Sequence, residues 1–316
     1  MMNLDLLPAS PVLSVMRCSD PETVGGLLPG TRRRLLPLAG DFKFFQAELR
    51  LGPLRLVTVK RPPCASEGYL DPAQIGIALP MNDSNGLKLD GQSLQRPALV
   101  THGLSIPHRI CQPSDLVIAA VFLPASKTDR GWPGRAQAAR IDGVRPEVLH
   151  QLRSIILDLV RLASRDPERF LLDNVVSGMQ QSLLGAIDHA YLTAPDEQAP
   201  GLAVGNYIRI CRRAEEFINA GSRALPGSAE VAEAAGVTIR TLHNAMVAVR
   251  GMNLQKFMIL NRLWPARAAL LRGGPGDLVK TVAFDHGFWH MGRFSRTYRA
   301  FFGESPSDTL ARARAG

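Results

Sequence analysis

The sequence predicts an α+β protein: an N-terminal β-barrel or sandwich, helices after it, and an all-α C-terminal domain. Three observations support this fold class. Short alternating apolar runs fill about the first 145 residues, helical periodicity replaces them from Pro146, and a helix–glycine–helix pattern occurs twice in the last third. With 316 residues, 46% of them hydrophobic, the chain is long enough for two domains.

The N-terminal part has the pattern of many short strands. Residues 48–51 alternate, Gly52-Pro53 supplies a turn, and residues 54–60 continue the alternation, which predicts a hairpin. Further short apolar runs follow at close spacing, at residues 74–79, 99–101, 109–111 and 116–123. Such spacing favours a small barrel or sandwich, a fold that often encloses one small ligand.

Helices are expected over residues 146–193, where apolar residues recur at steps of three and four. Their apolar faces can pack on the strands or pair with a second subunit, and the sequence leaves both open. Residues 194–205 hold two prolines and two glycines without periodicity, which predicts an interdomain linker.

The basic charge is concentrated in the last third. Residues 206–316 hold 16 Lys and Arg against 8 Asp and Glu, whereas residues 1–205 hold 21 against 20, so nearly all of the net charge of +9 lies there. Arginine suits bidentate contact with phosphate and guanine edges. Charge alone leaves both a nucleic-acid-binding surface and an ordinary solvated basic surface open.

Two units of helix, turn and helix are predicted, at about residues 228–250 and 277–302. In the first, Gly236 supplies the turn and Thr238 caps the helix that starts at Ile239; in the second, Gly287 supplies the turn. The later apolar positions of the second unit are shifted by one residue. Seven aromatic residues between 284 and 302 are expected to form its core rather than a stacking platform for bases.

A single helix is expected to join the two units. Asn253 can cap a helix that runs to about Arg272, a rod of roughly 30 Å. One turn of B-DNA is about 34 Å, so such a rod can place two helices in successive major grooves. Pro265 lies inside this helix and predicts a kink or break there.

The stretch from Gly287 to Ser307, GFWHMGRFSRTYRAFFGESPS, resembles the signature of the AraC/XylS family of bacterial transcription regulators. The resemblance covers about residues 206–313, and its Gly-Arg-Phe step and Pro-Ser-Asp-Thr-Leu ending resemble the XylS branch. It implies a transcription activator that binds double-stranded DNA with two helix-turn-helix units, acts with RNA polymerase and forms a homodimer. It also implies a cupin-like domain at residues 1–145 that binds a small effector, a dimerisation or packing region at 146–193, and a DNA-binding domain at 206–316.

Carried onto this chain, the resemblance names candidate DNA contacts. Arg240 and Arg296 suit guanine and Asn244 suits adenine, because these side chains can form paired hydrogen bonds with those bases. For each arginine the alternative is a solvated side chain or an ion pair with a nearby carboxylate. The base-reading set is Arg240, Thr241, His243, Asn244, Met291, Arg293, Ser295 and Arg296, and the phosphate-contacting set is Thr238, Lys256, His290 and Arg299.

Arg96, His102 and Arg109 are candidates to receive an acidic effector, with ordinary surface charges as the alternative. The second function considered is a cupin-like metal-dependent enzyme with an accessory basic domain. His102 and His108 are six residues apart without a His-x-His pair, so we expect no metal, no cofactor and no catalytic residue.

Four scattered cysteines argue against a disulfide framework and a structural zinc site. The longest apolar run, residues 116–124, is too short to cross a bilayer, and the first twenty residues have no basic n-region. We therefore expect a cytoplasmic protein with no membrane partner.

Overall fold

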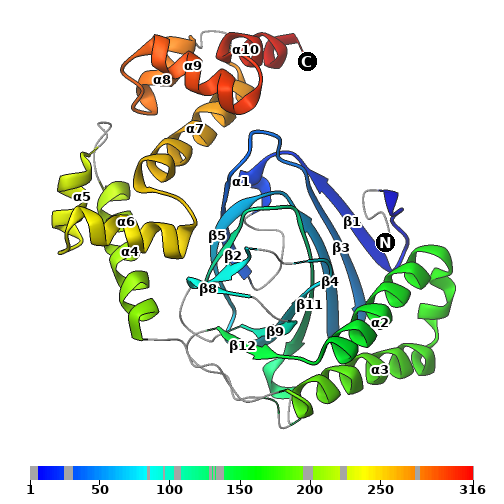
Figure 1. Ribbon diagram of the computed structural model, residues 1–316. Helices are drawn as coiled ribbons and strands as arrows, with labels where there is room; N and C mark the ends of the chain where they lie inside the picture. Colours follow the sequence, from blue (N-terminus) through cyan, green and yellow to red (C-terminus); the bar gives the residue numbers. More distant parts are fainter. Residues whose placement is uncertain are drawn as a thin grey trace. The chain divides into compact units, whose positions relative to one another are not determined.

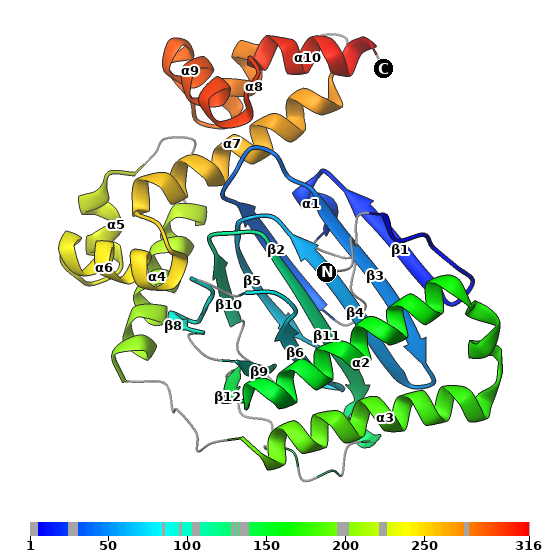
Figure 2. The ribbon, with the colours of Figure 1, turned by 45° about the vertical axis from the view of Figure 1, so that its right-hand side comes forward.

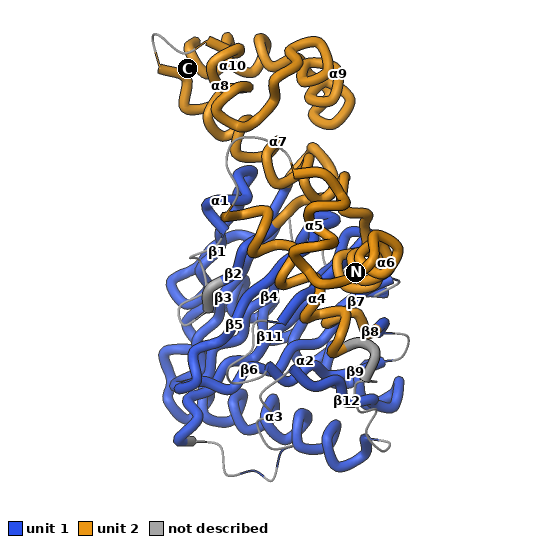
Figure 3. The backbone as a smooth tube through the Cα atoms, turned by 90° about the vertical axis from the view of Figure 1, so that its left-hand side faces the viewer, with its two compact units in different colours: residues 1–35, 43–89, 93–199 blue, residues 36–42, 90–92, 200–316 orange. Residues whose placement is uncertain are grey.

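The computed structural model describes residues 6–24, 31–83, 86–94, 97–102, 108–127, 130, 132, 139–194, 202–220, 226–274 and 278–315. The chain divides into two compact units, one of residues 1–35, 43–89 and 93–199 and the other of residues 36–42, 90–92 and 200–316 (Figure 3).

The first unit is built on two β-sheets (Figure 1). The seven-stranded sheet has the order β1 (Leu13–Cys18), β3 (Phe44–Leu51), β4 (Leu54–Arg61), β11 (Leu116–Pro124), β6 (Gln74–Pro80), β9 (Ala98–Thr101) and β12 (Arg140–Gly143). The five-stranded sheet has the order β2 (Thr31–Pro37), β5 (Cys64–Leu70), β10 (His108–Gln112), β7 (Lys88–Leu89) and β8 (Gln92–Ser93). The predicted barrel or sandwich is confirmed in its sandwich form, because among the described residues neither sheet closes on itself. A short helix, α1, spans Pro21–Val24.

The predicted hairpin over residues 48–60 is confirmed. Strands β3 and β4 pair antiparallel with Leu51 opposite Leu54, and Gly52 takes a positive φ of 58° in the turn between them. Successive side chains of a strand point to opposite faces of the sheet. On β3, Phe45 and Ala47 therefore join the core under the helices, whereas Phe44 and Gln46 face the other way.

Helices α2 (Pro146–Arg165) and α3 (Asp173–Leu192) run antiparallel beside one another along the seven-stranded sheet (Figure 2). Buried residues such as Leu152 and Ile156 of α2 and Ile187 of α3 share one core cluster with the strands. The helical region predicted from periodicity thus packs its apolar stripe on the sheet, and that stripe is not available to a second subunit.

The second unit contains seven described helices, which are labelled in Figure 1. They are α4 (Leu202–Ala220), α5 (Ser228–Ala234), α6 (Ile239–Arg250), α7 (Leu254–Arg272), α8 (Val279–Asp285), α9 (Met291–Phe302) and α10 (Pro306–Ala315). Helices α5 and α6 form the first predicted helix-turn-helix unit, α8 and α9 form the second, and α7 runs between them. None of the described helices is long and apolar enough to cross a membrane.

The two helix-turn-helix units repeat the same hydrogen bonds. In the first turn Val237 N donates to Ala232 O at 3.0 Å, and in the second Phe288 N donates to Ala283 O at 2.8 Å. The turn glycines, Gly236 and Gly287, have φ of 70° and 77°, a conformation that a side chain would strain. The internal repeat predicted from the sequence is therefore a structural repeat.

The second turn is one residue longer than the first. Helix α6 begins at Ile239, three residues after its turn glycine, whereas α9 begins at Met291, four residues after its own. This explains the one-residue shift of the apolar positions. With the helix starts superposed, Asn244 corresponds to Arg296 and Val247 corresponds to Arg299.

Helix α7 has the predicted cap and length but lacks the predicted break. Asn253 Oδ1 accepts from Lys256 N at 2.8 Å, and the helix then continues through Pro265 to Arg272. A proline inside a helix costs about 3 kcal/mol. Leu263, Ala266 and Leu270 flank Pro265 and are fully buried in the core of the second helix-turn-helix unit, and this packing offsets the cost.

Candidate DNA interface and inter-sheet cavity

Helix α6 presents one polar face to solvent. Arg240, His243 and Asn244 are exposed at helical spacing of three and four, whereas Leu242 and Met246 are buried against the rest of the unit. The cap predicted for this helix is confirmed, since Thr238 Oγ1 accepts from Thr241 N at 3.2 Å. The structure places three of the predicted base-reading side chains on a single accessible surface.

Val247 extends the same exposed face by one further turn and is 40% exposed. The sequence analysis did not single it out. Its spacing of seven residues from Arg240 is the signal that could have found it. An exposed apolar side chain at that place is suited to contact a thymine methyl group in a major groove.

Helix α9 has the corresponding exposed face. Arg293, Arg296 and Arg299 point to solvent, and the first two line a surface hollow together with Thr297. Phe294 and Tyr298, on the opposite side, are almost fully buried and lie with Phe288, Phe301 and Phe302 in the core of this unit. The expectation that all seven aromatic residues form this core is wrong for Trp289, which is 53% exposed and stacks on Phe284 outside the cluster.

The structure sorts the arginines into two groups. Arg250 forms a bidentate ion pair with buried Glu215, and both Arg267 and Arg312 bond Glu304. In contrast, the guanidinium groups of Arg240, Arg293 and Arg296 make no hydrogen bond or ion pair with the described residues. The three arginines that the resemblance assigns to base reading are thus among the arginines that make no such bond, as are Arg213 and Arg299 within the described part of the chain.

The remaining predicted DNA contacts are spread around these two faces. Lys256, His290 and Thr238 are exposed, and Ser295 is half-buried. The Thr241 hydroxyl lies 2.9 Å from that of Thr238, and Met291 packs against the core of the second unit.

Glu304 ties helix α10 to helix α7. Its carboxylate accepts from Arg312 Nη2 at 2.9 Å and lies 2.8 Å from Arg267 Nη1 of α7, and it also accepts from the Thr309 hydroxyl. These donors, with Arg312 the strongest, lower the pKa of Glu304 to about 2, against a smaller opposing effect of burial. The carboxylate is therefore charged throughout the physiological range.

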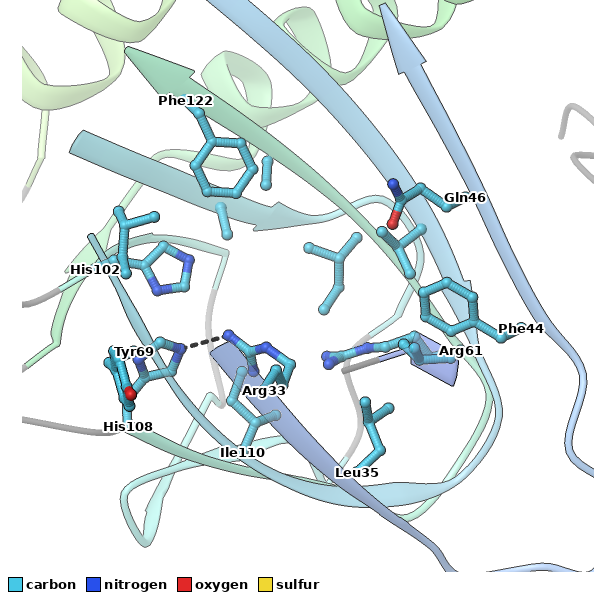
Figure 4. Close-up of a pocket in the computed structure, with 16 residues that line it drawn as sticks. Arg33, Leu35, Phe44, Gln46, Arg61, Tyr69, His102, His108, Ile110 and Phe122 are labelled. Carbon is cyan, nitrogen blue, oxygen red and sulfur yellow. Dashed lines mark hydrogen bonds between the residues drawn. The ribbon is translucent and has the colours of Figure 1, made fainter. Parts of the chain in front are cut away.

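A cavity of about 80 Å³ lies between the two sheets of the first unit (Figure 4). The seven-stranded sheet contributes apolar side chains that face away from α2 and α3, and the five-stranded sheet contributes the opposite wall. Its lining includes Leu35, Phe44, Val59, Ile110, Ile118 and Phe122, with Tyr69 at a more exposed position.

Of the three predicted effector residues, one lines this cavity. His102 does so, whereas Arg96 lies outside the described residues. Arg109 is buried, not on the surface, and pairs with Glu67 at 2.6 Å. On β10 the lining residues are His108 and Ile110, so the alternation of the strand turns Arg109 toward the other face.

Two arginines that the sequence analysis did not single out line the cavity. Arg33 of β2 donates to the Ser66 hydroxyl at 3.2 Å, and its Nη2 lies 2.7 Å from His108 Nε2. Arg61, at the end of β4, is 5% exposed, and its Nε and Nη2 have no hydrogen-bond partner among the described residues. Burial, reinforced by the charge of Arg61, lowers the pKa of Arg33 to about 9.

The two cavity histidines are buried side by side. Their rings lie 4.4 Å apart between centroids. Burial, reinforced by Arg33 and Arg61, lowers the pKa of His102 to about 3, and the pKa of His108 is lowered well below its ordinary value. Two adjacent guanidinium groups repel a cation, and in the described part of the chain no three His, Cys, Asp or Glu residues gather as a metal site.

The second unit thus holds two helix-turn-helix units joined by one helix, and each has a polar outer face with at least one arginine that is unpaired among the described residues, an arrangement typical of DNA-binding domains. Residues 231–312 match the family model described as a helix-turn-helix domain. The probable thc operon regulatory protein of Rhodococcus erythropolis is 31% identical over 150 residues, 46% of this chain and 44% of that protein. The XylDLEGF operon transcriptional activator 3 of Pseudomonas putida is 26% identical over 199 residues, 61% of this chain and 59% of that protein.

A solved structure of a probable AraC family transcriptional regulator from Rhodopseudomonas palustris is 31% identical, with 33% of this chain and 96% of that chain covered and a TM-score of 0.30. The chain spans about half the length of the two curated relatives described. The C-terminal region is a helix-turn-helix domain of the AraC/XylS type, and the resemblance stated from the sequence, including that to XylS-type activators, is confirmed.

Proposed function

We propose that this chain is a sequence-specific transcription activator that reads two successive major-groove segments of double-stranded DNA. The observation that carries the proposal is the structural repeat: two helices, α6 and α9, each follow the same hydrogen-bonded turn and each expose polar side chains. Helix α7, with 19 residues, is about 28 Å long, which is close to the rise of one turn of B-DNA, about 34 Å.

The proposed base contacts follow the chemistry of the exposed faces. Arg240 and Arg296 pair with guanine edges, and Asn244 pairs with adenine. Thr241, His243, Met291, Arg293 and Ser295 complete the proposed base-reading set. Thr238, Lys256, His290 and Arg299 set the register by holding phosphates.

Activation is proposed because several relatives are named operon transcriptional activators, and an activator needs contact with RNA polymerase.

We propose a homodimer, or two protomers on tandem sites. Because the apolar faces of α2 and α3 are covered by the sheet, the dimer contact is expected elsewhere, and Leu171 and Leu172, exposed where α2 leads into α3, are candidates. A regulator of this kind works in the cytoplasm.

The first unit is proposed as the effector-binding domain, over residues 1–145, with residues 146–193 packed on it and residues 194–205 as the linker. The cavity between its sheets supports this assignment. We do not propose an enzyme: the arginines beside His102 and His108 oppose a catalytic cation, and the curated relatives described are named as regulators.

Selection of random-sequence duplex DNA by the purified full-length protein tests the proposal. Two enriched motifs about one helical turn apart are expected, with one lost in Arg240→Ala and the other in Arg296→Ala. Arg165→Ala, which removes an exposed arginine of α2 in the other unit, is the control and should leave both motifs intact. Enrichment of the same motifs by all three variants contradicts the proposed base contacts.

A further inference from the structure

Trp289 is a large aromatic side chain that the second helix-turn-helix unit leaves exposed, at 53% of its surface. Its indole Nε1–H makes no hydrogen bond with the described residues. The other two tryptophans are less exposed and have a partner: Trp132 donates to Asp188 at 2.6 Å, and Trp264 donates to a main-chain carbonyl oxygen at 3.2 Å. Trp289 therefore offers both an apolar ring and an unused donor to a partner outside the described residues.

The extra residue of the second turn is Trp289. Val237 and Phe288 make the same hydrogen bond in the two turns, and Thr238 and His290 occupy the same position, directly before α6 and α9. Trp289 lies between Phe288 and His290 and so has no counterpart in the first turn. Because the first turn joins its helices without such a residue, the repeat itself does not require Trp289.

A ring stack outside the core holds the indole in place. The Trp289 ring lies on Phe284, with centroids 5.6 Å apart and an angle of 29° between the planes. The Lys280 ammonium group lies 5.5 Å from the centroid of the Phe284 ring. A side chain that is already held loses less conformational entropy when it binds, so this stack prepares Trp289 for contact with a partner.

A groove of about 290 Å³ beside Trp289 indicates where that partner lies. Its lining includes Ser228 at the start of α5, Gln255 and Met258 of α7, and His290 and Arg293 at the start of α9. The groove therefore extends from the first helix-turn-helix unit to the second, along the helix that joins them. Two major-groove segments in succession on one face of B-DNA are separated by the minor groove and the phosphate strands that border it.

The charges around the groove favour a phosphate. Arg293 and His290 are exposed, Lys280 is exposed nearby, and none of the described lining residues is acidic. Asp285, at the end of α8, is exposed but does not line the groove. An indole combines an N–H group that can only donate with a broad apolar face. A DNA strand matches both features, because each phosphate oxygen accepts hydrogen bonds and each deoxyribose presents an apolar surface.

We propose that Trp289 contacts the DNA backbone at the edge of the major-groove segment read by α9, with its Nε1–H donated to a phosphate oxygen and its ring packed against the adjoining deoxyribose. This inference rests on the proposed function, since it requires α9 to lie in a major groove. Contacts of this kind fix the register without reading bases. The first turn has no equivalent residue, so the two half-sites are held unequally.

Tryptophan fluorescence of the full-length protein, titrated with the selected duplex, tests the contact. The emission of the unchanged protein should shift on binding, because DNA covers the exposed indole. Trp132→Phe, the control in the first unit, should retain this shift, whereas Trp289→Phe should lose it. Trp289→Phe keeps an aromatic ring but lacks the donor, so its affinity for DNA should fall about 10- to 100-fold. A thermal melt of each variant shows that it is folded.

Ethylation interference with the same duplex locates the contact. Ethylation of one phosphate beside the α9 motif, on the side of the other motif, should weaken binding of the unchanged protein but not of Trp289→Phe. A merely structural role would lower the affinity of the variant and leave the pattern of interfering phosphates intact. That result, or a full emission shift in Trp289→Phe, overturns the proposal. Normal DNA affinity of Trp289→Phe with lost activation of a reporter gene also overturns it, and assigns Trp289 to a protein partner.

The outcome is separable from that of the proposed function. Two enriched motifs together with equal behaviour of Trp289→Phe and the unchanged protein overturn only the Trp289 contact. A phosphate contact does not depend on sequence, so a Trp289-dependent emission shift on random-sequence duplex without enriched motifs supports the contact and overturns sequence-specific reading. Absence of any DNA binding overturns both.

Discussion

Removal of Glu215 should release helix α6 from helix α4. Glu215 lies on α4, and Arg250 is the last residue of α6. Arg250 Nε donates a hydrogen bond to Glu215 Oε1 at 2.6 Å, and Arg250 Nη2 donates a second one to Glu215 Oε2. The side chains are 10% and 6% exposed, so both charges lie away from water. Truncating one partner of such a pair leaves an uncompensated buried charge and costs about 3–5 kcal/mol.

Hydrogen exchange of the full chain, followed by mass spectrometry of its peptides, measures this effect locally. In Glu215→Ala, peptides from α4 and α6 should exchange at least about a hundredfold faster, since each 1.4 kcal/mol corresponds to about tenfold. Peptides from α9 should change little, because they belong to the other helix-turn-helix unit. The same variant should weaken DNA binding, because the recognition face of α6 is no longer held in place.

Glu216→Ala provides the matched control. Glu216 is the next residue of the same helix, 67% exposed, and pairs with Arg212 at 3.7 Å. An exposed pair of this kind contributes less than about 1 kcal/mol, so exchange should be nearly unchanged. Replacing both buried partners by Glu215→Leu and Arg250→Met should recover most of the protection. Equal protection of the α4 and α6 peptides from hydrogen exchange in Glu215→Ala and Glu216→Ala would refute the claim that the buried Glu215–Arg250 ion pair holds α6 against α4.

Three further predictions concern the second unit. The folded-state pKa of Glu304 is lowered to about 2 from 4.5, so its contribution to stability is present above about pH 4.5 and is lost as the pH falls toward 2. Measured by hydrogen exchange of α10 peptides, Glu304→Gln should be about 2 kcal/mol less stable than the unchanged protein at pH 7 and no less stable at pH 2. A difference in stability that persists at pH 2 contradicts this prediction. Lys256→Ala should weaken binding equally on all DNA sequences and lower the slope of log affinity against log salt by about one, whereas Arg296→Ala should cost about 1–3 kcal/mol on the selected site only. Pro265→Ala should raise the melting temperature of the helical unit, because it restores a hydrogen bond to Asn261 O in a helix that is already continuous; an unchanged or lower temperature contradicts this account.

The exposed faces of α6 and α9 could be predicted because amphipathic periodicity encodes them locally. Arg240, His243 and Asn244 share a face for any regular helix that buries Leu242 and Met246, whatever the tertiary structure. The turn glycines are likewise determined by a few neighbouring residues. This part of the candidate site therefore follows from the sequence with little further information.

The cavity could not be predicted, because it depends on how distant strands stack. Arg33 sits in an Arg-Arg-Arg run and Arg61 precedes two prolines, and both patterns are typical of a solvated surface. They face one cavity because β2 and β4 belong to different sheets whose inner faces oppose one another. The position of Arg109 was misjudged for the related reason that the sequence does not show which face of β10 is turned inward.

Pro265 shows a different limit, because the helix continues through a residue at which the sequence predicts a kink or break, and the structure contradicts the break. The sequence predicts a kink or break, yet the burial of Leu263, Ala266 and Leu270 keeps α7 helical on both sides of the proline. The continuity of this helix matters for the proposed function, since α7 sets the separation of α6 and α9, the two proposed recognition helices.

Methylation interference on the selected DNA site tests most directly the claim that two recognition helices read two major-groove segments. The account predicts two clusters of guanines, about one helical turn apart, at which methylation of N7 blocks binding. Arg240→Ala should make binding insensitive to methylation in one cluster only, and Arg296→Ala in the other only. A single cluster, or loss of sensitivity at the same guanines in both variants, would contradict the account.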